Sequence, residues 1–332
     1  MTGPNSSPSS VSDQSLESAS SALIKARKEI AKTVFGQDTV IEYTLATLIS
    51  GGHALLIGVP GLAKTLLVET AATVLGLSSN RIQCTPDLMP ADVLGTEVLE
   101  EDHNGKRHFR FIPGPVFTQF LMADEINRAS PRTQSALLQA MQEREVSIGG
   151  HRHALPAPFH VLATQNPIEQ EGTYPLPEAQ LDRFLMQIDV DYPDADAERH
   201  MMLVTTTSRE EPVATVLDAQ RLLEIQSLVR DMPIGESVVD SILALVRAGR
   251  PGTDAPDLIN DYVLWAPGPR ASQALMLATR AKALLEGRET PSIDDVAALA
   301  EPVLKHRMEL NYKAQAAGVT KAKIIQALVD AL

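Results

Sequence analysis

Residues 54–65 read ALLIGVPGLAKT, in which four apolar residues precede a turn that is rich in glycine. The apolar run predicts a strand buried on both faces, and a helical pattern begins at Lys64. A glycine-rich turn between such a strand and a helix directs backbone N–H groups and the positive end of the helix at a polyphosphate. The residues predicted to bind phosphate are Gly58, Val59, Pro60, Gly61, Leu62, Ala63, Lys64 and Thr65.

Two residues of this loop have individual roles in the predicted site. Lys64 is expected to reach the β- and γ-phosphates, and the Thr65 hydroxyl is expected to ligate Mg²⁺. Ala63 stands where the usual loop has glycine, and alanine costs little there if its φ angle is negative. For the loop alone, a tight strand–helix turn with a surface lysine is the alternative interpretation.

A second apolar run, at residues 120–123, ends in the acidic pair Asp124 and Glu125. Because parallel strands end at the same edge of a sheet, Asp124 can lie beside the phosphate loop. We expect Asp124 to order Mg²⁺ or its waters, and Glu125 to polarise the attacking water as general base. A strand that simply leaves the core through charged residues is the alternative. The two motifs together predict that the chain binds Mg·ATP and hydrolyses it.

A third apolar strand, at residues 159–163, is followed by Thr164, Gln165, Asn166 and Pro167. Asn166 would lie between the other two strand ends, where its amide could contact the γ-phosphate or the water. An Asn-Pro turn is the alternative, since this dipeptide favours turns by itself. Beside the other two motifs, we favour the role of a γ-phosphate sensor.

The remaining pattern predicts an α/β fold, with a doubly wound parallel sheet followed by a smaller all-α domain. Strands that alternate with helices predict a parallel sheet covered on both faces. Further strands are expected at 81–84 and 186–190, and helices at 23–34, 38–50, 64–75 and 131–144. Later helical patterns lie at 194–206, 217–230, 236–249, 269–286, 292–311 and 320–331. We therefore expect a nucleotide-binding domain at 21–191 and a helical domain at 192–332.

Three segments fall outside this regular pattern. Residues 1–20 are rich in serine and predict a disordered tail. Residues 85–118 form a long connector with four prolines. Residues 145–155 predict a small hairpin that turns at Gly149 and Gly150. Long excursions from a compact sheet are usually functional.

Composition excludes several classes of protein. The single cysteine, Cys84, excludes an internal disulfide framework. No signal peptide or membrane span is evident, so a cytoplasmic location is expected. The formal charge of −13 argues against nucleic acid as the main partner, because phosphate binding needs a concentrated positive surface. Basic residues do gather near the C-terminus, where we expect solvated helix faces: Lys305, Arg307, Lys313, Lys321 and Lys323.

Several ordered motifs resemble one known family. They are GVPGLAKT at 58–65, TPDLMP at 85–90, GPVF at 114–117, ADEINRA at 123–129, TQSALLQAMQER at 133–144, ATQNP at 163–167 and LPEAQLDRF at 176–184. These segments are similar to those of the MoxR ATPases, from the helix-two-insert branch of the AAA+ proteins, which share the alanine before the lysine. The resemblance runs from about Gln37 to the C-terminal helices.

The resemblance implies an AAA+ module, in which the second domain is a lid and residues 85–118 and 145–155 are the insertions of this branch. It implies that Arg183 is the arginine finger that reaches the ATP of a neighbouring subunit, and that Arg270 is the sensor arginine of the lid. Without the resemblance, both would read as ordinary surface or ion-pair arginines. A planar, permanently charged guanidinium suits the phosphate oxygens of the transition state.

The resemblance also implies a homo-oligomeric ring, a hexamer, that couples hydrolysis to a protein client. Chaperone-like remodelling, maturation or cofactor insertion is the expected outcome, and a von Willebrand factor A domain protein is a candidate partner. Two alternatives stay open. The first is a nucleic-acid-remodelling motor, against which the acidic charge argues. The second is a nucleotide-gated scaffold with incidental hydrolysis, against which Glu125 and Arg183 argue.

Overall fold

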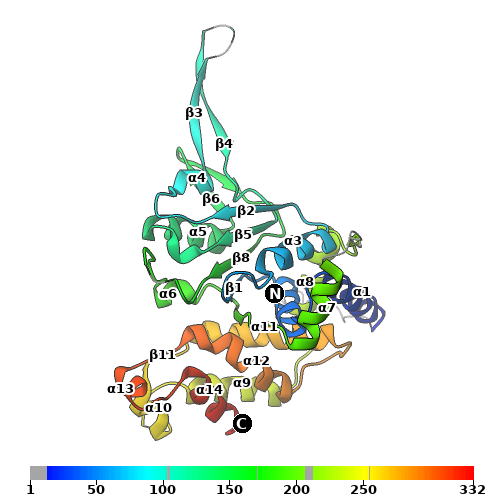
Figure 1. Cartoon of the computed structure of the whole chain (residues 1–332), viewed down its shortest axis with the longest axis vertical. Coiled ribbons are helices and arrows are strands. Elements are labelled where there is room, and N and C mark those ends of the chain that lie inside the picture. Colours follow the sequence, from blue (N-terminus) through cyan, green and yellow to red (C-terminus); the bar gives the residue numbers. More distant parts are fainter. Residues whose placement is uncertain (1–12, 102, 104, 170, 206–211, 254) are drawn as a thin grey trace, which may run out of the picture.

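The computed structural model describes residues 13–101, 103, 105–169, 171–205, 212–253 and 255–332. A parallel sheet with helices on both faces forms the middle of the molecule (Figure 1). A helical domain lies along one side of it, and a long β-hairpin projects from the opposite side (Figure 1). The expected order, an α/β domain followed by a smaller helical one, is confirmed.

Five parallel strands form the sheet in the order β2-β5-β8-β1-β9. Their bounds are Ser79–Gln83 for β2, Phe120–Asp124 for β5, His160–Gln165 for β8, Ala54–Ile57 for β1 and Met186–Asp189 for β9. The register pairs Gln83 with Asp124, and Ile57 with Gln165. The carboxyl ends of these strands therefore meet at one edge of the sheet, where the motifs predicted to bind and hydrolyse ATP lie.

Alternate residues of the central strands point into two separate apolar cores. Leu56 and Met122 belong to the core on one face, whereas Leu55 and Leu121 belong to the core on the other. This double burial is the reason that the strands read as continuous apolar runs. The first core also contains helices α1 (Asp13–Ala31), α2 (Asp38–Ile49) and α3 (Lys64–Val74), and the second contains α5 (Pro131–Glu143).

Two helix starts behave as their sequences indicate. Ser130 caps α5, with its hydroxyl accepting a bond from the Thr133 N–H, and Pro131 is the first helical residue. Ser292 and Asp295 form a capping box at the start of α12 (Ile293–Leu304). Both arrangements satisfy N–H groups that a helix start leaves without partners.

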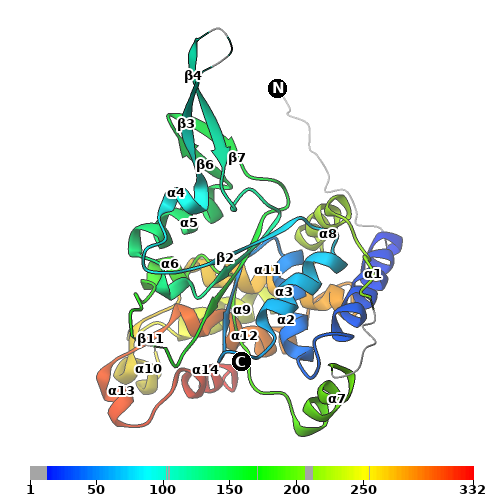
Figure 2. The same ribbon diagram turned by 45° about the horizontal axis from the view of Figure 1, so that its top comes forward.

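The two insertions are hairpins that lie side by side (Figure 2). The hairpin expected at 145–155 is confirmed as β6 (Glu145–Ile148) and β7 (His151–Ala154). The connector at 85–118 holds a short helix, α4 (Pro90–Leu94), and a second hairpin that the sequence did not indicate, β3 (Gly95–Glu101) and β4 (Arg107–Pro113). The Phe111 ring in β4 stacks on the His153 ring in β7, with centroids 3.9 Å apart.

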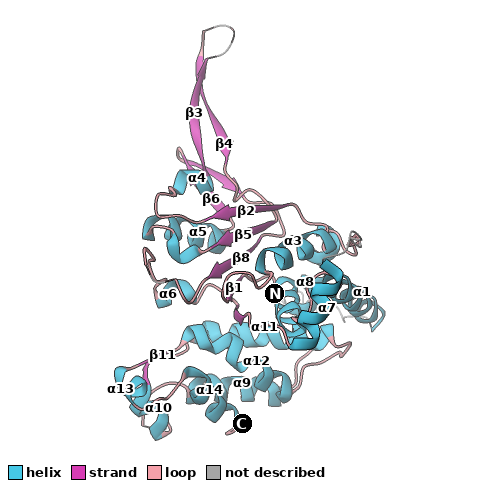
Figure 3. Cartoon of the chain, viewed as in Figure 1, coloured by secondary structure: helices cyan, strands magenta, loops and turns pink. Residues whose placement is uncertain are grey.

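The second domain is helical as expected, apart from one short sheet. Its helices are α7 (Ala195–Thr205), α8 (Ala219–Asp231), α9 (Glu236–Ala248), α10 (Asp257–Tyr262), α11 (Pro269–Leu285), α12, α13 (Tyr312–Ala316) and α14 (Lys321–Val329). A two-stranded antiparallel sheet pairs β10 (Val263–Trp265) with β11 (Glu309–Leu310), which Figure 3 shows in magenta. Single turns complete the fold: η1 (Ile126–Arg128), α6 (Glu178–Leu181) and η2 (Lys305–Arg307). None of the described helices is long and apolar enough to cross a bilayer.

The prediction of a disordered tail over residues 1–20 is wrong for its second part. Helix α1 begins at Asp13, and Leu16, Ala19 and Leu23 are buried. Their spacing of three and four residues places them on one face of α1, which packs against α2, α3 and α11. Because the segment is rich in serine, its few apolar residues were not recognised as the buried face of a helix. Residues 1–12 lie outside the described part of the chain.

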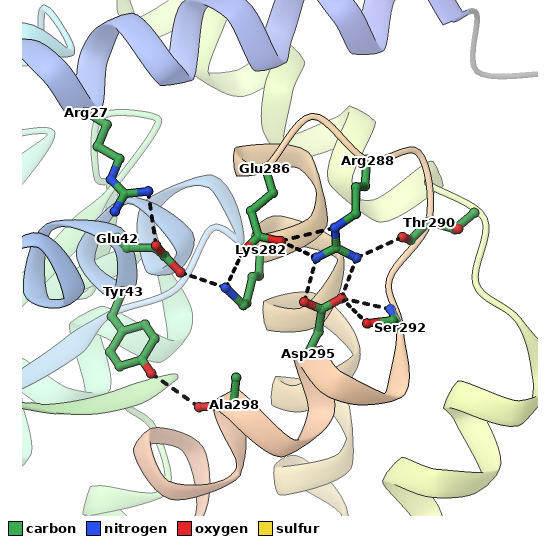
Figure 4. A network of polar contacts seen from close by, with 10 residues as sticks. All are labelled: Arg27, Glu42, Tyr43, Lys282, Glu286, Arg288, Thr290, Ser292, Asp295 and Ala298. Carbon is green, nitrogen blue, oxygen red and sulfur yellow. Dashed lines mark hydrogen bonds and ion pairs between the residues drawn. The ribbon is translucent and has the colours of Figure 1, made fainter.

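A polar network joins the first helices to the second domain (Figure 4). The Glu42 carboxylate of α2 forms an ion pair with Arg27 of α1 at 3.1 Å and accepts a bond from Lys282 of α11 at 2.9 Å. Arg288 continues the network to Asp295 at the start of α12. Since residues of α1, α2, α11 and α12 also share one apolar core, the two domains pack as one body in this structure.

We expect the packing of α1 to contribute measurably to stability. Leu23→Ala should lower the free energy of unfolding by about 2–5 kcal/mol, because the Leu23 side chain is fully buried and its loss leaves a cavity. Ile24→Ala is the matched control, since the neighbouring Ile24 is 41% exposed. Urea unfolding followed by circular dichroism measures both. Equal stability of the two variants would mean that α1 does not dock on the core.

Candidate functional site

The glycine-rich loop joins β1 to α3 at the carboxyl edge of the sheet. The N–H of Gly58 donates to the carbonyl of Gln165, 3.2 Å away, which ties the loop to the end of β8. A Cβ atom on Gly58 would lie 2.5 Å from the Val190 carbonyl oxygen, so a larger residue does not fit there. Gly61 has a φ of +86°, which glycine adopts without strain.

Ala63 does not meet the condition under which alanine costs little. Its φ is +55°, in the left-handed region, immediately before α3 begins. A residue with a Cβ pays roughly 1–2 kcal/mol for this conformation. The strain explains why glycine is usual at this position of such loops, and the chain holds the alanine there nonetheless.

Lys64 folds back over the loop. Its ammonium group donates to the carbonyls of Gly58 at 2.5 Å and Val59 at 2.7 Å. Burial lowers the pKa of Lys64, while the nearby charges of Asp124 and Glu125 act in the opposite sense. The structure thus brings the loop lysine and the acidic pair together, as the sequence predicted.

The Thr164 hydroxyl links the two acidic residues across the sheet. It donates to Asp124 Oδ1 at 2.6 Å and accepts from the backbone N–H of Glu125 at 2.8 Å. Glu125 itself has a φ of +54°, so the chain turns sharply between the two carboxylates. A hydroxyl at the last but one residue of β8 therefore fixes the shape of the acidic motif.

Three further side chains hold the carboxylates, and sequence reasoning missed all of them. Arg81 donates to Asp124 Oδ2 at 2.5 Å. The Glu125 carboxylate accepts from Gln83 at 3.0 Å and from Arg128 at 3.1 Å. The end of β2 supplies Arg81 and Gln83, and a signal for them existed, because polar residues at a strand end beside an acidic strand face the same site.

Asn166 follows β8 at the expected edge, where it forms a turn. Its Oδ1 accepts from the Ile168 N–H at 3.2 Å, and its amide donates to Glu169 at 3.4 Å. Arg128 then bridges Glu169 at 3.3 Å and Glu125 at 3.1 Å. The turn interpretation is therefore realised, and the same contacts connect Asn166 to the expected general base.

The donor set at this edge suits Mg·ATP. Mg²⁺ prefers oxygen ligands and is usually held by one or two carboxylates together with substrate phosphates. Thr65 at the start of α3 and Asp124 at the end of β5 supply a hydroxyl and a carboxylate. The described residues contain no cluster of three or more His, Cys, Asp or Glu that could hold a metal by itself. The residues present thus fit a metal that arrives with the nucleotide.

Arg183 and Arg270 lie at the other edge of the sheet. Both line a cavity of about 250 Å³, together with Gly52 and His53, which directly precede β1. From Gly52 to Gly58 the chain crosses the sheet, roughly 20 Å at about 3.3 Å per residue. This distance exceeds the reach of an arginine side chain, so neither guanidinium meets the phosphate loop of its own chain.

Arg307 lines the same cavity and corrects the expectation of a solvated basic face. It is buried, and its Nε donates to Asp182 Oδ1 at 2.8 Å. Of the other basic residues near the C-terminus, Lys305 pairs with Asp189, and Lys321 pairs with Glu309. Lys313 and Lys323 are exposed, as expected. The cluster in the sequence is therefore divided in the fold between separate ion pairs and solvated positions.

Comparison with known proteins agrees with the division into an α/β nucleotide-binding domain and a helical lid. A profile for the "ATPase family associated with various cellular activities (AAA)" matches residues 53–186, and an AAA lid domain matches residues 260–328. "Chaperone MoxR1" of Mycobacterium tuberculosis is 42% identical over 91% of this chain and 79% of that protein. "Protein MoxR" of Methylorubrum extorquens is 34% identical over 87% of this chain and 88% of that protein.

A solved structure extends the likeness to three dimensions. The crystal structure of a proposed ATPase from Cytophaga hutchinsonii superposes with a TM-score of 0.87 at 38% identity, covering 96% of each chain. The relatives match over nearly the whole chain, which includes the phosphate loop, the acidic strand and the lid. This chain therefore belongs to the MoxR family of AAA+ ATPases.

Proposed function

We propose that the chain works as a closed ring of identical copies, a hexamer, which hydrolyses Mg·ATP between neighbours to remodel a protein client. One observation carries the proposal. The phosphate loop and the acidic pair lie at one edge of the sheet, whereas Arg183 and Arg270 lie at the other. A single copy therefore holds two halves of a site that cannot meet within it.

The first half binds the nucleotide and activates water. Backbone N–H groups of the loop and the Lys64 ammonium would hold the phosphates, and Thr65 and Asp124 would hold Mg²⁺, whose charge neutralises the phosphate oxygens. Gln83 and Arg128 donate hydrogen bonds to the Glu125 carboxylate and hold it in place. From that position the carboxylate would take a proton from water. Asn166, tied to Glu125 through Glu169 and Arg128, would orient that water or the γ-phosphate.

The second half would come from the next copy. When Arg183 and Arg270 of one copy face the loop of its neighbour, each contact is head-to-tail, and such contacts close into rings. The guanidinium groups would then stabilise the charge that develops on the transferred phosphoryl group. This arrangement makes hydrolysis depend on assembly.

The two hairpins are the surface that we assign to the client. The Phe111–His153 stack joins them into one projecting unit (Figure 2). Leu99 and Phe109 are opposite each other in the β3–β4 register and are 55% and 70% exposed. Large apolar side chains that stay exposed in a group mark contact sites for other proteins. The relative named "Chaperone MoxR1" is consistent with such a role, and a von Willebrand factor A domain protein is a candidate partner.

The first test concerns Glu125. Glu125→Gln keeps the shape of the side chain but cannot accept a proton, so turnover should fall by about 10²–10⁴-fold while ATP affinity is unchanged. Glu69→Gln, on an exposed position of α3, is the control and should hydrolyse ATP normally. Phosphate release and nucleotide titration measure the two quantities. Wild-type turnover of Glu125→Gln would move the base elsewhere and leave hydrolysis unexplained.

The second test concerns the shared site. Arg183→Ala should be nearly inactive, because an arginine finger contributes about 10³–10⁵ in rate. Co-expression of Arg183→Ala with Glu125→Gln should restore activity from two inactive proteins. Random one-to-one mixing makes roughly a quarter of the head-to-tail contacts whole, which is the upper bound if sites act independently. Absence of recovery in rings shown to be mixed would contradict the shared site.

The third test separates client contact from hydrolysis. Replacement of Leu99 and Phe109 by serine should leave basal hydrolysis unchanged, since neither residue lies near the phosphate loop. Stimulation of hydrolysis by a permanently unfolded polypeptide, such as reduced and carboxymethylated α-lactalbumin, should be lost. Serine at Leu264, which is 70% exposed in the lid, is the control. Equal stimulation of both variants would remove the hairpins from client binding.

A further inference from the structure

A single buried arginine of the lid makes hydrogen bonds to the short segment around Arg183. Arg307, at the end of η2, is 2% exposed and makes five hydrogen bonds. Nε donates to the Asp182 carboxylate at 2.8 Å, and the other nitrogens reach the carbonyls of Asp182, Phe184 and Leu185 at 3.4, 2.5 and 3.1 Å. Four of these five bonds therefore end on the residues that flank Arg183.

The neighbouring His306 adds a second hold on the same segment. Its Nε2 lies 3.0 Å from the Phe184 carbonyl, in a fully buried position. Burial and the adjacent Arg307 charge keep the pKa of His306 well below its usual range, so the ring is neutral and donates through Nε2. Phe184 is itself fully buried. The backbone on both sides of Arg183 is thus fixed by the lid.

The Arg183 side chain, by contrast, is left available. Among the ion pairs of the described residues none involves Arg183, which is only partly buried and borders the cavity. A fixed backbone with an unpaired guanidinium suits a residue whose partner comes from another molecule. The orientation of that guanidinium then depends on the contacts that Arg307 makes.

Asp182 links Arg307 to the second arginine of the cavity. Its Oδ1 accepts from Arg307, and its Oδ2 lies 3.8 Å from Nη1 of Arg270, at the start of α11. One carboxylate therefore lies between the buried arginine and Arg270. A buried ion pair contributes little net stability compared with apolar packing, so stability alone does not account for Arg307.

We propose that Arg307 is a positioning residue that fixes Arg183 and Arg270 in the orientation in which they meet the phosphates bound to the next copy. The inference rests on the proposed function, in which those two arginines act across the ring contact. Arg307 belongs to the lid, and four of its five bonds are to residues 182–185, which directly precede β9. The position of the lid therefore sets the activity of the neighbouring site.

Single variants test whether Arg307 acts on rate rather than on binding. Arg307→Met fills a similar volume without the hydrogen bonds, and misplacement of Arg183 should lower kcat by about 10²-fold with the KM for ATP unchanged. Arg307→Lys keeps the charge but loses the planar fork, so it should recover part of kcat. Lys282→Met is the matched control. This substitution breaks the ion pair between Lys282 and Glu42, whose side chains are 14% and 15% exposed. It therefore removes a largely buried charge without changing the contacts of residues 182–185.

A mixing experiment then locates the defect. Arg307→Met co-expressed with Glu125→Gln should regain activity, because the intact Glu125 of one copy meets correctly placed arginines of the other. Arg307→Met co-expressed with Arg183→Ala should show no more activity than the two variants do separately, because both defects lie on the same side of the contact. Should Arg307→Met fail to fold, Arg307→Lys takes its place in both mixtures. This pattern of recovery is one that a general loss of structure would not produce.

The outcomes distinguish a failure of the role of Arg307 from a failure of the site shared between copies. Wild-type kcat in Arg307→Met overturns the inference, and so does recovery when it is mixed with Arg183→Ala. Failure of the Arg307→Met mixture with Glu125→Gln overturns the inference alone, provided that Arg183→Ala recovers with Glu125→Gln. If that reference mixture also fails, the shared site of the proposed function falls, and the inference falls with it.

Discussion

In a parallel sheet every strand ends at the same edge, and in this chain the pairing of β5, β8 and β1 determines where the groups that we expect to be catalytic can lie. The register of Ile57 with Gln165 brings the start of the phosphate loop against the end of β8. One residue earlier, the Thr164 hydroxyl bonds to both Asp124 and the Glu125 backbone. A slip of one residue in this pairing would turn Thr164 to the opposite face and separate the carboxylates from the loop.

The same geometry separates the two groups of residues that we propose to form one site across a contact between copies. Strands that deliver the loop and the carboxylates to one edge necessarily place the residues before β1 and β9 at the other. Arg183 lies three residues before β9, and the lid contributes Arg270 and Arg307 at that same edge. The separation is therefore a consequence of the topology, and no side-chain movement within one copy can close it.

The sequence predicted the strands of the sheet and the motifs at their ends. It did not predict features that depend on contacts between distant segments. The runs before Gly58 and Asp124 are apolar throughout because both faces are buried, and that signal is strong. The β3–β4 hairpin gave little signal in the sequence. Most of its side chains are exposed, so apolar and polar residues do not alternate as they do in a strand with one face on a core. Arg307 looked like its basic neighbours, because burial of a long side chain is decided by residues 182–185, more than a hundred positions away.

Backbone conformation reveals a further regularity in the site. Of the non-glycine residues that the structure describes, Ala63, Glu125 and Arg144 have a positive φ. Ala63 opens α3 below the phosphate loop, and Glu125 is the expected base. Arg144 ends α5 and donates to the Gly51 carbonyl, beside the cavity that Arg183 and Arg270 line. Each such residue costs of order 1–3 kcal/mol and persists only where its surroundings hold it. The strain in this fold thus falls at both edges of the sheet, on the two halves that a neighbouring copy would bring together.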